Sequence, residues 1–259
     1  MSGPLLSAHD LCIKTANRVL IEHLNLELWP GQRLAVLGQN GTGKTSLLHS
    51  LMGLRPVAHG GIAINQQALN TWSRPALARQ FGLLFQKLHD DMPATVRETA
   101  MLGRLPHARN WQWETEEDWA TVDAALHAMD LANIAEREVS SLSGGERQRL
   151  AIAALLAQNP HVYLLDEPGN HLDISFQIKV LRLFRREACV NHKALLMATH
   201  DINLVSGFCD RVLLLYGNGQ FRLGEVHEVL RDDILSEVYQ CKVRHVEASG
   251  NRVFFVDKR

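Results

Sequence analysis

The chain has few cysteines, little net charge and no long apolar run, and each absence argues against a class of protein. Its four cysteines, Cys12, Cys189, Cys209 and Cys241, lie far apart without a C-x-x-C pair. This spacing predicts reduced thiols and argues against a zinc site or a disulfide framework. The 27 basic and 28 acidic residues nearly balance, so no polyelectrolyte attraction to nucleic acid or anionic lipid is expected.

Membrane and export signals are also missing from the sequence. No apolar stretch approaches the roughly 18 residues that a membrane span requires. Residues 1–6 lack a basic region followed by a long apolar core, which argues against a secretory signal. We therefore expect a soluble, intracellular protein.

Strand and helix signals alternate along the chain of 259 residues, as they do in α/β proteins. Residues 11–28 and 60–65 carry strand patterns, and apolar runs at 162–165, 194–197 and 211–215 predict buried strands. Between about 93 and 158 helical signals replace them, with residues 118–129 apolar at helical spacing. Residues 236–259 predict a small β-rich tail. The fold class is α/β, with a β-rich N-terminal part and an inserted helical subdomain.

The most informative motif occupies residues 38–45, which read G-Q-N-G-T-G-K-T and fit the phosphate-binding pattern G-x-x-x-x-G-K-[ST]. An apolar strand precedes it and a helix pattern follows. Backbone N–H groups of such a loop surround phosphate oxygens, while Lys44 can reach the β and γ phosphates and Thr45 can ligate Mg²⁺. The predicted ATP-binding residues here are Gly38, Gln39, Asn40, Gly41, Thr42, Gly43, Lys44, Thr45 and Ser46.

Two carboxylates follow the apolar run at 162–165. Asp166 is placed to hold Mg²⁺ at the end of a buried strand, as enzymes with such a phosphate loop require. Glu167 can orient and deprotonate the water that attacks the γ phosphate. An acid after an apolar run is common by itself, and the phosphate loop upstream is what favours this interpretation.

A second anion site is predicted around Ser143, Gly144 and Gly145. Ser143 is a suitable helix N-cap, the glycines allow close backbone approach, and a helix over about 146–158 would place its positive end there. An ordinary capped helix would explain this segment equally well if it stood alone.

Together these motifs resemble the ATPase subunits of ATP-binding cassette (ABC) transporters over nearly the whole chain. The resemblance makes residues 38–45 the Walker A motif, 162–166 the Walker B strand, Glu167 the catalytic glutamate and 142–148 the family signature. It also implies a Q-loop glutamine at Gln86, which takes part in catalysis, ligates Mg²⁺ and senses the membrane partner. A D-loop at 170–173 and a catalytic switch histidine, His200, that contacts the γ phosphate are implied as well.

The resemblance implies a single ABC ATPase domain over 1–259. Within it we expect a nucleotide-binding core at 1–86 and 159–235, a helical signature subdomain at 87–158, and a C-terminal extension at 236–259. Family members work as head-to-tail dimers with ATP and Mg²⁺, each ATP lying between Walker A of one copy and the signature of the other. The implied partners are a second copy, an integral membrane permease and a solute-binding protein, without nucleic acid. The implied location is peripheral, at the cytoplasmic face of the bacterial inner membrane.

The chain departs from the family pattern at two positions. The family usually has an aromatic residue that stacks on adenine where this chain has Thr15, and no Tyr, Phe or Trp occurs between Met1 and Leu28. We therefore expect weaker base stacking. Gly169 stands where Thr or Ser is usual, and we expect it to loosen the loop between Glu167 and Asp173.

Residues 95–107, T-V-R-E-T-A-M-L-G-R-L-P-H, resemble importer ATPases for ferric siderophores, haem and cobalamin, as do residues 170–174, 200–204 and the tail. The same residues could instead mark a helical surface that several ABC branches share. The alternatives are therefore another transporter branch, including an exporter, and, more remotely, a non-transport ABC protein or a switch that never hydrolyses ATP. Trp111, Trp113 and Trp119 are predicted to pack the insertion, or alternatively to line a groove for the membrane partner.

Overall fold

The computed structural model describes residues 3–16, 18–85, 93–108, 114–248 and 251–257. Its contacts divide the chain into two compact units, Met1–Thr71 with Leu181–Arg259, and Trp72–Val180. These boundaries differ from those of the expected subdomains, because the strand that ends in Asp166 belongs to the same unit as the helical insertion. The expected division by function remains a prediction.

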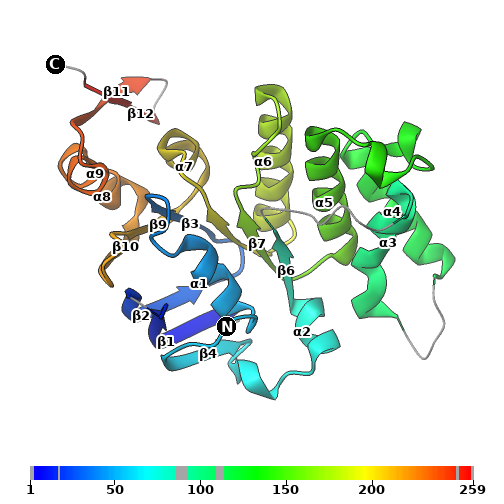
Figure 1. Ribbon diagram of the computed structural model, residues 1–259, viewed down its shortest axis with the longest axis horizontal. Coiled ribbons are helices and arrows are strands. Elements are labelled where there is room, and N and C mark those ends of the chain that lie inside the picture. The colour runs from blue at the N-terminus through cyan, green and yellow to red at the C-terminus, as the bar shows by residue number, and fades with distance from the viewer. Residues whose placement is uncertain (1–2, 17, 86–92, 109–113, 249–250, 258–259) are drawn as a thin grey trace. The chain divides into compact units, whose positions relative to one another are not determined.

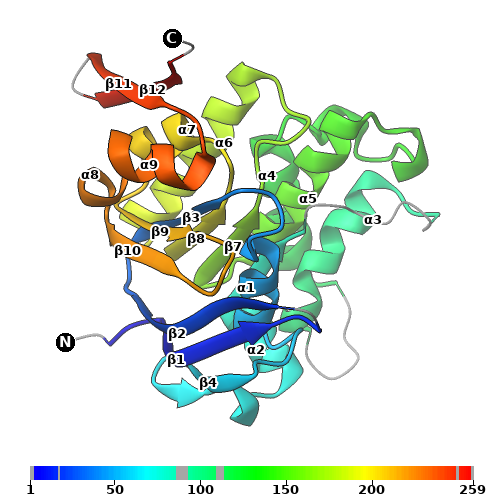
Figure 2. The ribbon, with the colours of Figure 1, turned by 60° about the vertical axis from the view of Figure 1, so that its left-hand side comes forward.

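The first unit contains an antiparallel sheet near the N-terminus, drawn in blue for β1 and β2 and in cyan for β4 in Figure 2. Its strands lie in the order β2-β1-β4-β5. Along β2 the buried residues Leu24, Leu26 and Leu28 alternate with exposed ones, as expected for a sheet with one face on a core. The strand prediction for 11–28 is therefore confirmed. The elements are β1 (Leu6–Lys14), β2 (Val19–Leu28), β4 (His59–Ile64) and β5 (Gln67–Ala68), followed by the 3-10 turn η1 (Leu69–Thr71).

The same unit contains a second group of strands, in the order β10-β9-β3-β8. β3 runs parallel to β8 and β9, and β10 is antiparallel to β9. All five residues of β8 are buried, which explains its continuous apolar run, because strands covered on both faces need not alternate. These strands are β3 (Arg33–Gly38), β8 (Ala194–Ala198), β9 (Arg211–Leu215) and β10 (Phe221–Glu225), and the helices are α1 (Lys44–Leu51), α7 (Ile202–Phe208), α8 (Val226–Val229) and α9 (Asp232–Tyr239).

The chain ends in a hairpin of β11 (Val243–Ala248) and β12 (Asn251–Val256), which confirms the strands predicted for the tail. Asn203 of α7 holds the hairpin through both of its polar atoms. Its Nδ2 donates to the backbone oxygen of Phe254 at 3.0 Å, and its Oδ1 accepts from the Phe254 N–H at 2.7 Å. The hairpin is thus attached to α7 by hydrogen bonds from a side chain to its backbone, as well as by contacts between α7 and β12.

The second unit holds the helical insertion and two parallel strands. Figure 1 shows α3, α4 and α5 side by side, and they contact one another pairwise. A Cβ at Gly82 of β6 would lie 2.2 Å from Leu155 of α5, so the strand and the helix pack closely. The elements are α2 (Arg74–Gln80), β6 (Phe81–Leu84), α3 (Val96–Met101), η2 (Leu102–His107), α4 (Glu116–Ala128), η3 (Ala132–Ile134), η4 (Val139–Ser141), α5 (Gly144–Gln158), β7 (Val162–Asp166) and α6 (Ile174–Cys189), which crosses the unit boundary.

The helix predicted at 118–129 is α4, which starts at a Thr115 capping box and buries Val122 and Leu126. Trp119 is half-buried on this helix, with the Arg97 guanidinium 4.5 Å from its ring centroid. It therefore contacts a charged side chain of the insertion, and the alternative that it lines a groove for the membrane partner stays open. Trp111 and Trp113 lie outside the described residues. Among the residues that the structure describes, no helix is both long and apolar enough to cross a bilayer.

Candidate nucleotide-binding site

The phosphate loop of the first unit leaves β3 at Gly38 and enters α1 at Lys44. Gly38 and Gly43 have φ angles of 150° and 111°, which side chains other than glycine rarely tolerate. A Cβ on Gly38 would also lie 2.6 Å from the Thr42 hydroxyl and 2.7 Å from the Leu215 carbonyl oxygen. These two positions therefore require glycine, because the loop backbone adopts conformations there that other residues rarely reach and passes too close to its neighbours at Gly38 for a side chain.

Lys44 lies inside this loop, with only 8% of its surface exposed. Its Nζ donates to the carbonyl oxygens of Gly38 at 2.8 Å and Gln39 at 3.2 Å. The Thr42 hydroxyl donates to the Gln39 carbonyl at 2.9 Å and closes the turn. A buried ammonium group is costly unless it has partners, so the loop holds a desolvated cation in position for an anion.

Three segments distant in sequence brace the outside of the loop. The Arg18 guanidinium donates to the carbonyl oxygen of Gly41. The side-chain amide of Gln39 donates to the Val238 carbonyl of α9 at 2.7 Å. A Cβ at Gly217, in the turn between β9 and β10, would lie 3.1 Å from Thr42 Cγ2. None of these contacts was predicted, because the partners are separated by 23 residues or more and share no motif.

His200 lies at the same edge of the sheet as the phosphate loop. Val36 of β3 is level with Ala198 of β8, so two residues further along Gly38 and His200 leave neighbouring parallel strands at the same height. The Thr199 N–H extends the pairing by donating to the Val36 carbonyl at 3.1 Å. His200 is exposed, and Asp201 after it caps α7 by accepting from the Leu204 N–H at 2.9 Å. The strand register thus brings together the predicted loop and the predicted switch histidine.

The second unit carries the two predicted carboxylates at the end of β7. Asp166 is 3% exposed and Glu167 is 9% exposed. Glu167 has a φ angle of 52°, a left-handed conformation that non-glycine residues adopt mainly where the surroundings impose it. The Asn170 N–H donates to the Glu167 carbonyl at 3.1 Å, and Gln148 of α5 donates to the Pro168 carbonyl at 3.3 Å. The carboxylates are therefore held on a hydrogen-bonded turn.

Gln86 lies outside the described residues. The pairing of Leu84 with Leu165 shows that β6 and β7 end level with each other. Because Gln86 itself is not described, its predicted roles in catalysis and Mg²⁺ binding stay predictions.

The predicted signature segment begins α5, with Ser143 as its N-cap as expected. The Glu146 N–H donates to the Ser143 hydroxyl at 3.3 Å, and the Ser143 N–H donates to the Glu146 carboxylate at 2.8 Å. The bond from the Ser143 backbone N–H to the carboxylate, followed by one from the Ser143 side chain, lowers the pKa of Glu146. Ser143 and Gly144 are exposed, so the positive end of α5 faces solvent.

The predicted D-loop lies directly beside the signature segment. A Cβ on Gly145 would lie 2.9 Å from the His171 carbonyl oxygen, whereas one on Gly144 would lie 3.9 Å from the His171 side chain. The loop expected to be loosened by Gly169 is tied by Gln177, whose amide donates to the carbonyl oxygens of Gly169 at 3.0 Å and Leu172 at 3.2 Å. These hydrogen bonds hold the loop between Glu167 and Asp173, and the sequence gave no sign of them.

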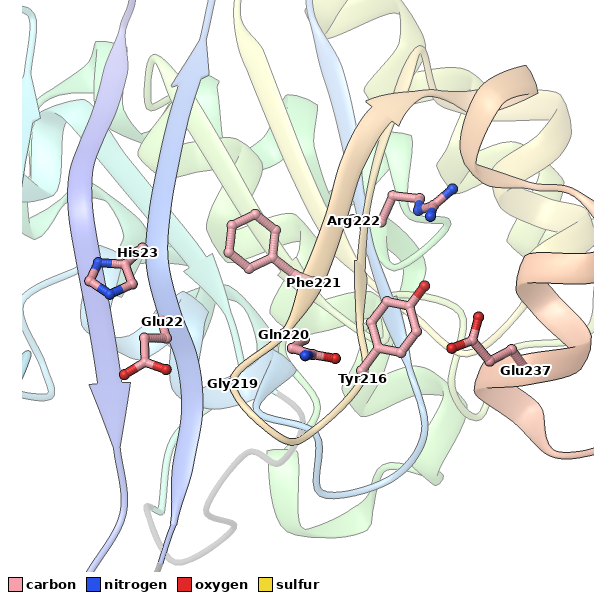
Figure 3. Close-up of a pocket in the computed structure, with 8 residues that line it drawn as sticks. All are labelled: Glu22, His23, Tyr216, Gly219, Gln220, Phe221, Arg222 and Glu237. Carbon is pink, nitrogen blue, oxygen red and sulfur yellow. The ribbon is translucent and has the colours of Figure 1, made fainter.

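The first unit also contains an open hollow of about 510 Å³ between β2, the β9–β10 turn and α9. Figure 3 shows Glu237 directed toward Tyr216 on one side of the turn, with Glu22 and His23 on β2 at the other side. The lining contains one arginine, Arg222, and two carboxylates, Glu22 and Glu237. Phosphate binding requires the opposite charge balance, so this hollow is not a second phosphate site.

Comparison with known proteins identifies the family. The ABC transporter profile matches residues 21–170. A hemin import ATP-binding protein of Pseudomonas fluorescens, HmuV, is 38% identical over 92% of this chain and 94% of its own. The achromobactin transport ATP-binding protein CbrD of Dickeya dadantii is 34% identical over 93% and 90%. An inward-facing metal-chelate type ABC transporter superimposes with a TM-score of 0.83 at 27% identity, covering 97% of this chain and 96% of the other. The chain belongs to the ABC transporter family, as one of its ATP-hydrolysing subunits.

Proposed function

We propose that this protein powers an ABC importer of a metal chelate, such as a siderophore, haem or cobalamin. The observation that carries the proposal is a phosphate loop closed around buried Lys44 in a chain similar over 92% or more of its length to haem and siderophore import subunits. Its partners would be a second copy, a membrane permease and a solute-binding protein. It would act peripherally at the cytoplasmic face of the inner membrane.

The residues present fit a triphosphate with its magnesium ion. Lys44 already rests on two carbonyl oxygens in the loop, and a phosphate oxygen would offer it a charged partner, which makes stronger hydrogen bonds. Thr45 in the first turn of α1 and buried Asp166 are oxygen donors of the kind Mg²⁺ prefers, with Gln86 as a third. When bound, the ion neutralises charge on the β and γ phosphates.

Glu167 is the proposed general base for the attacking water. The left-handed turn that holds it sets where its side chain leaves the backbone, and positioning is the main requirement for in-line attack on a phosphate. His200, at the same sheet edge as the loop, is the proposed contact to the γ phosphate. Ser143, Gly144 and Gly145 are the proposed contacts to the ATP bound by the partner copy.

The catalytic part of the proposal is tested with Glu167→Gln, which keeps shape and hydrogen bonding but removes the base. We expect ATP to bind with a Kd within about threefold of the parent, while hydrolysis falls at least about 100-fold, as removal of a general base implies. Glu117→Gln, on an exposed residue of α4, is the matched control and should hydrolyse normally. Parental hydrolysis by Glu167→Gln would rule out Glu167 as the base.

The transport part is tested by isolating tagged Glu167→Gln protein from gently solubilised native membranes and identifying what accompanies it. A polytopic membrane protein with a solute-binding protein supports the importer, and the latter's ligand can then be measured. A membrane protein whose reconstituted transport runs outward would favour the exporter alternative. A ribosome or another soluble partner would overturn a transport role.

A further inference from the structure

The short 3-10 helix η2 presents two different faces within the stretch 95–107. Residues three apart lie one above the other in a 3-10 helix. Leu102 and Leu105 form an exposed face. Arg104 and His107 form a second face, which is half-buried, and both side chains reach the last turn of α5. The spacing R-x-x-H therefore directs a guanidinium and an imidazole onto the end of one helix.

These two side chains satisfy carbonyl oxygens at the C-terminal end of α5. Arg104 Nη1 donates to the Ala157 carbonyl oxygen at 2.9 Å, and His107 Nε2 donates to the Gln158 carbonyl oxygen at 2.8 Å. The last four carbonyl groups of a helix have no partner within the helix, and α5 has no basic residue in its own last turn. The cation that complements the negative end of its dipole is therefore supplied by η2.

A glycine and an ion pair hold η2 close to α5. A Cβ on Gly103 would lie 2.1 Å from the Ala154 carbonyl oxygen and 3.1 Å from the Gln158 backbone nitrogen, so a side chain there would push the two helices apart. Arg104 is fixed in turn by Asp118, whose Oδ1 accepts from its Nε at 2.7 Å. Asp118 belongs to the capping box that starts α4. Arg104 thus connects the end of α5 to the start of α4.

Further hydrogen bonds anchor the same end of α5 to the segment that leads into β6. The side-chain amide of Gln158 donates to the carbonyl oxygens of Ala78 at 2.6 Å and Phe81 at 2.7 Å. The other end of the helix starts with exposed Ser143 and Gly144. A helix of 15 residues is about 22 Å long, so a small tilt at the anchored end displaces the exposed end.

We propose that Gly103, Arg104 and His107 are positioning residues for ATP hydrolysis: they fix the C-terminal end of α5 and thereby aim its N-terminal end at the ATP bound by the partner copy. The inference rests on the proposed contact of residues 143–145 with that ATP. The three residues act through α5 and do not touch the nucleotide. Their loss therefore leaves ATP binding to the phosphate loop of the same chain intact, and weakens the contact between the two copies.

The test measures ATP binding and ATP-dependent dimerisation separately, on Glu167→Gln protein so that ATP persists. Calorimetry at low protein concentration gives the Kd for Mg–ATP, and sedimentation at rising protein concentration gives the dissociation constant of the dimer. The variants are Arg104→Ala, His107→Ala and His107→Gln, which replaces the imidazole N–H with an amide N–H. Arg97→Ala is the matched control, because Arg97 also pairs with α4, through Asp123 at 3.0 and 2.8 Å, and these bonds do not involve α5.

We expect Arg104→Ala and His107→Ala to raise the dissociation constant of the dimer about fivefold, the effect of losing one well-placed hydrogen bond. The Kd for Mg–ATP should stay within about twofold of the parent, and His107→Gln should recover dimerisation to within about twofold. Arg97→Ala should dimerise as the parent does. Arg104→Lys keeps the charge and is a milder change, so it should weaken dimerisation by a smaller factor.

Circular dichroism checks that each variant is folded at the assay temperature. A purely structural role would lower the unfolding temperature without changing the dissociation constant of the folded dimer, and this result would overturn the inference. Equal weakening by Arg97→Ala would also overturn it, because the effect would then be a general loosening of the helical insertion. A parent protein that binds Mg–ATP but stays monomeric would instead reject the proposed dimer site on which the inference rests.

Discussion

Two helix N-termini of this chain are predicted anion sites, and they are built differently. α1 follows the glycine loop without a side-chain cap and without an acidic residue in its first turn. α5 is capped by Ser143 and carries Glu146 in its first turn. No side chain therefore caps the start of α1, which adds buried Lys44, whereas side chains at the start of α5 satisfy part of its N–H groups.

The difference indicates how the α1 loop of one copy and the α5 end of the other copy would share one ATP in the proposed dimer. The α1 loop has a desolvated cation, Lys44, and under the proposed function it would bind the triphosphate without help from α5. The end of α5 offers a helix dipole partly offset by the carboxylate of Glu146, since a negative charge at a helix N-terminus opposes its positive potential. We infer that affinity for ATP comes mainly from the α1 loop, and that α5 adds a weaker contact to the ATP held by the α1 loop of the partner copy.

The largest effect is expected from Lys44→Ala. Removing a buried cation that meets phosphate should weaken ATP binding by about 3 kcal/mol, or more than 100-fold in Kd, because charge-assisted hydrogen bonds are lost. Calorimetry with Mg–ATP measures this, and Ser143→Ala is the comparison, with an expected change below about threefold in the isolated chain. An equal rise in the Kd for ATP in the two variants would contradict the inference that the α1 loop supplies most of the ATP affinity.

A smaller effect on stability is expected from Gly145→Ala. The added Cβ would lie 2.9 Å from the His171 carbonyl oxygen, so backbone must shift, at a cost of about 2 kcal/mol by analogy with overpacked cores. Gly144→Ala is the matched control, because its Cβ would be 3.9 Å from His171. Urea unfolding measures both variants. Similar stabilities would show that the D-loop does not press on the start of α5.

The smallest effect concerns the capping box of α5. Ser143→Ala should cost about 1 kcal/mol in the free energy of unfolding, as N-cap replacements do. Glu146→Gln should remove the part that depends on charge. Because folding lowers the Glu146 pKa from its ordinary value of 4.5, the stability due to the carboxylate is present above pH 4.5 and is lost as the pH falls through the folded value.

The measurement is urea unfolding of the parent and Glu146→Gln proteins at several pH values. The parent should be the more stable protein at pH 7, and the difference should shrink as the solution becomes more acidic than pH 4.5. A difference that grows in acid would mean that Glu146 is not held as a carboxylate by Ser143. Ser143→Ala should retain most of this pH dependence, because the backbone N–H of residue 143, which contributes most to the lowered pKa, is still present.

Much of the fold could be predicted, because the buried strands are unambiguous in the sequence. β7, β8 and β9 stand out as apolar runs, and the helical stretch has a clear period along α4. The helices α2 and α6 were not predicted, although Ser73 with proline at 75 gives α2 a recognisable start. The division into units was also not predicted, because the sequence does not reveal how closely β6 packs on α5.

In the candidate site too, the sequence predicts residues with local partners but not residues placed by contacts between distant segments. Lys44, Ser143 and Asp201 have local partners, so their positions follow from motif and capping rules. Arg18 has no motif, and its contact with Gly41 spans 23 residues. Its place on the phosphate loop depends on how the β1–β2 turn packs, which no local pattern encodes.

By itself the sequence determined which residues form the phosphate loop, the buried strands and the capped signature helix. Each of these depends on neighbouring residues and on a fixed period or pattern. The tertiary structure alone decided that Val36 is level with Ala198, which brings His200 beside the loop, and that Glu167 adopts a left-handed turn. Strand register and imposed backbone strain arise from contacts between distant segments, and these exist only once the chain has folded.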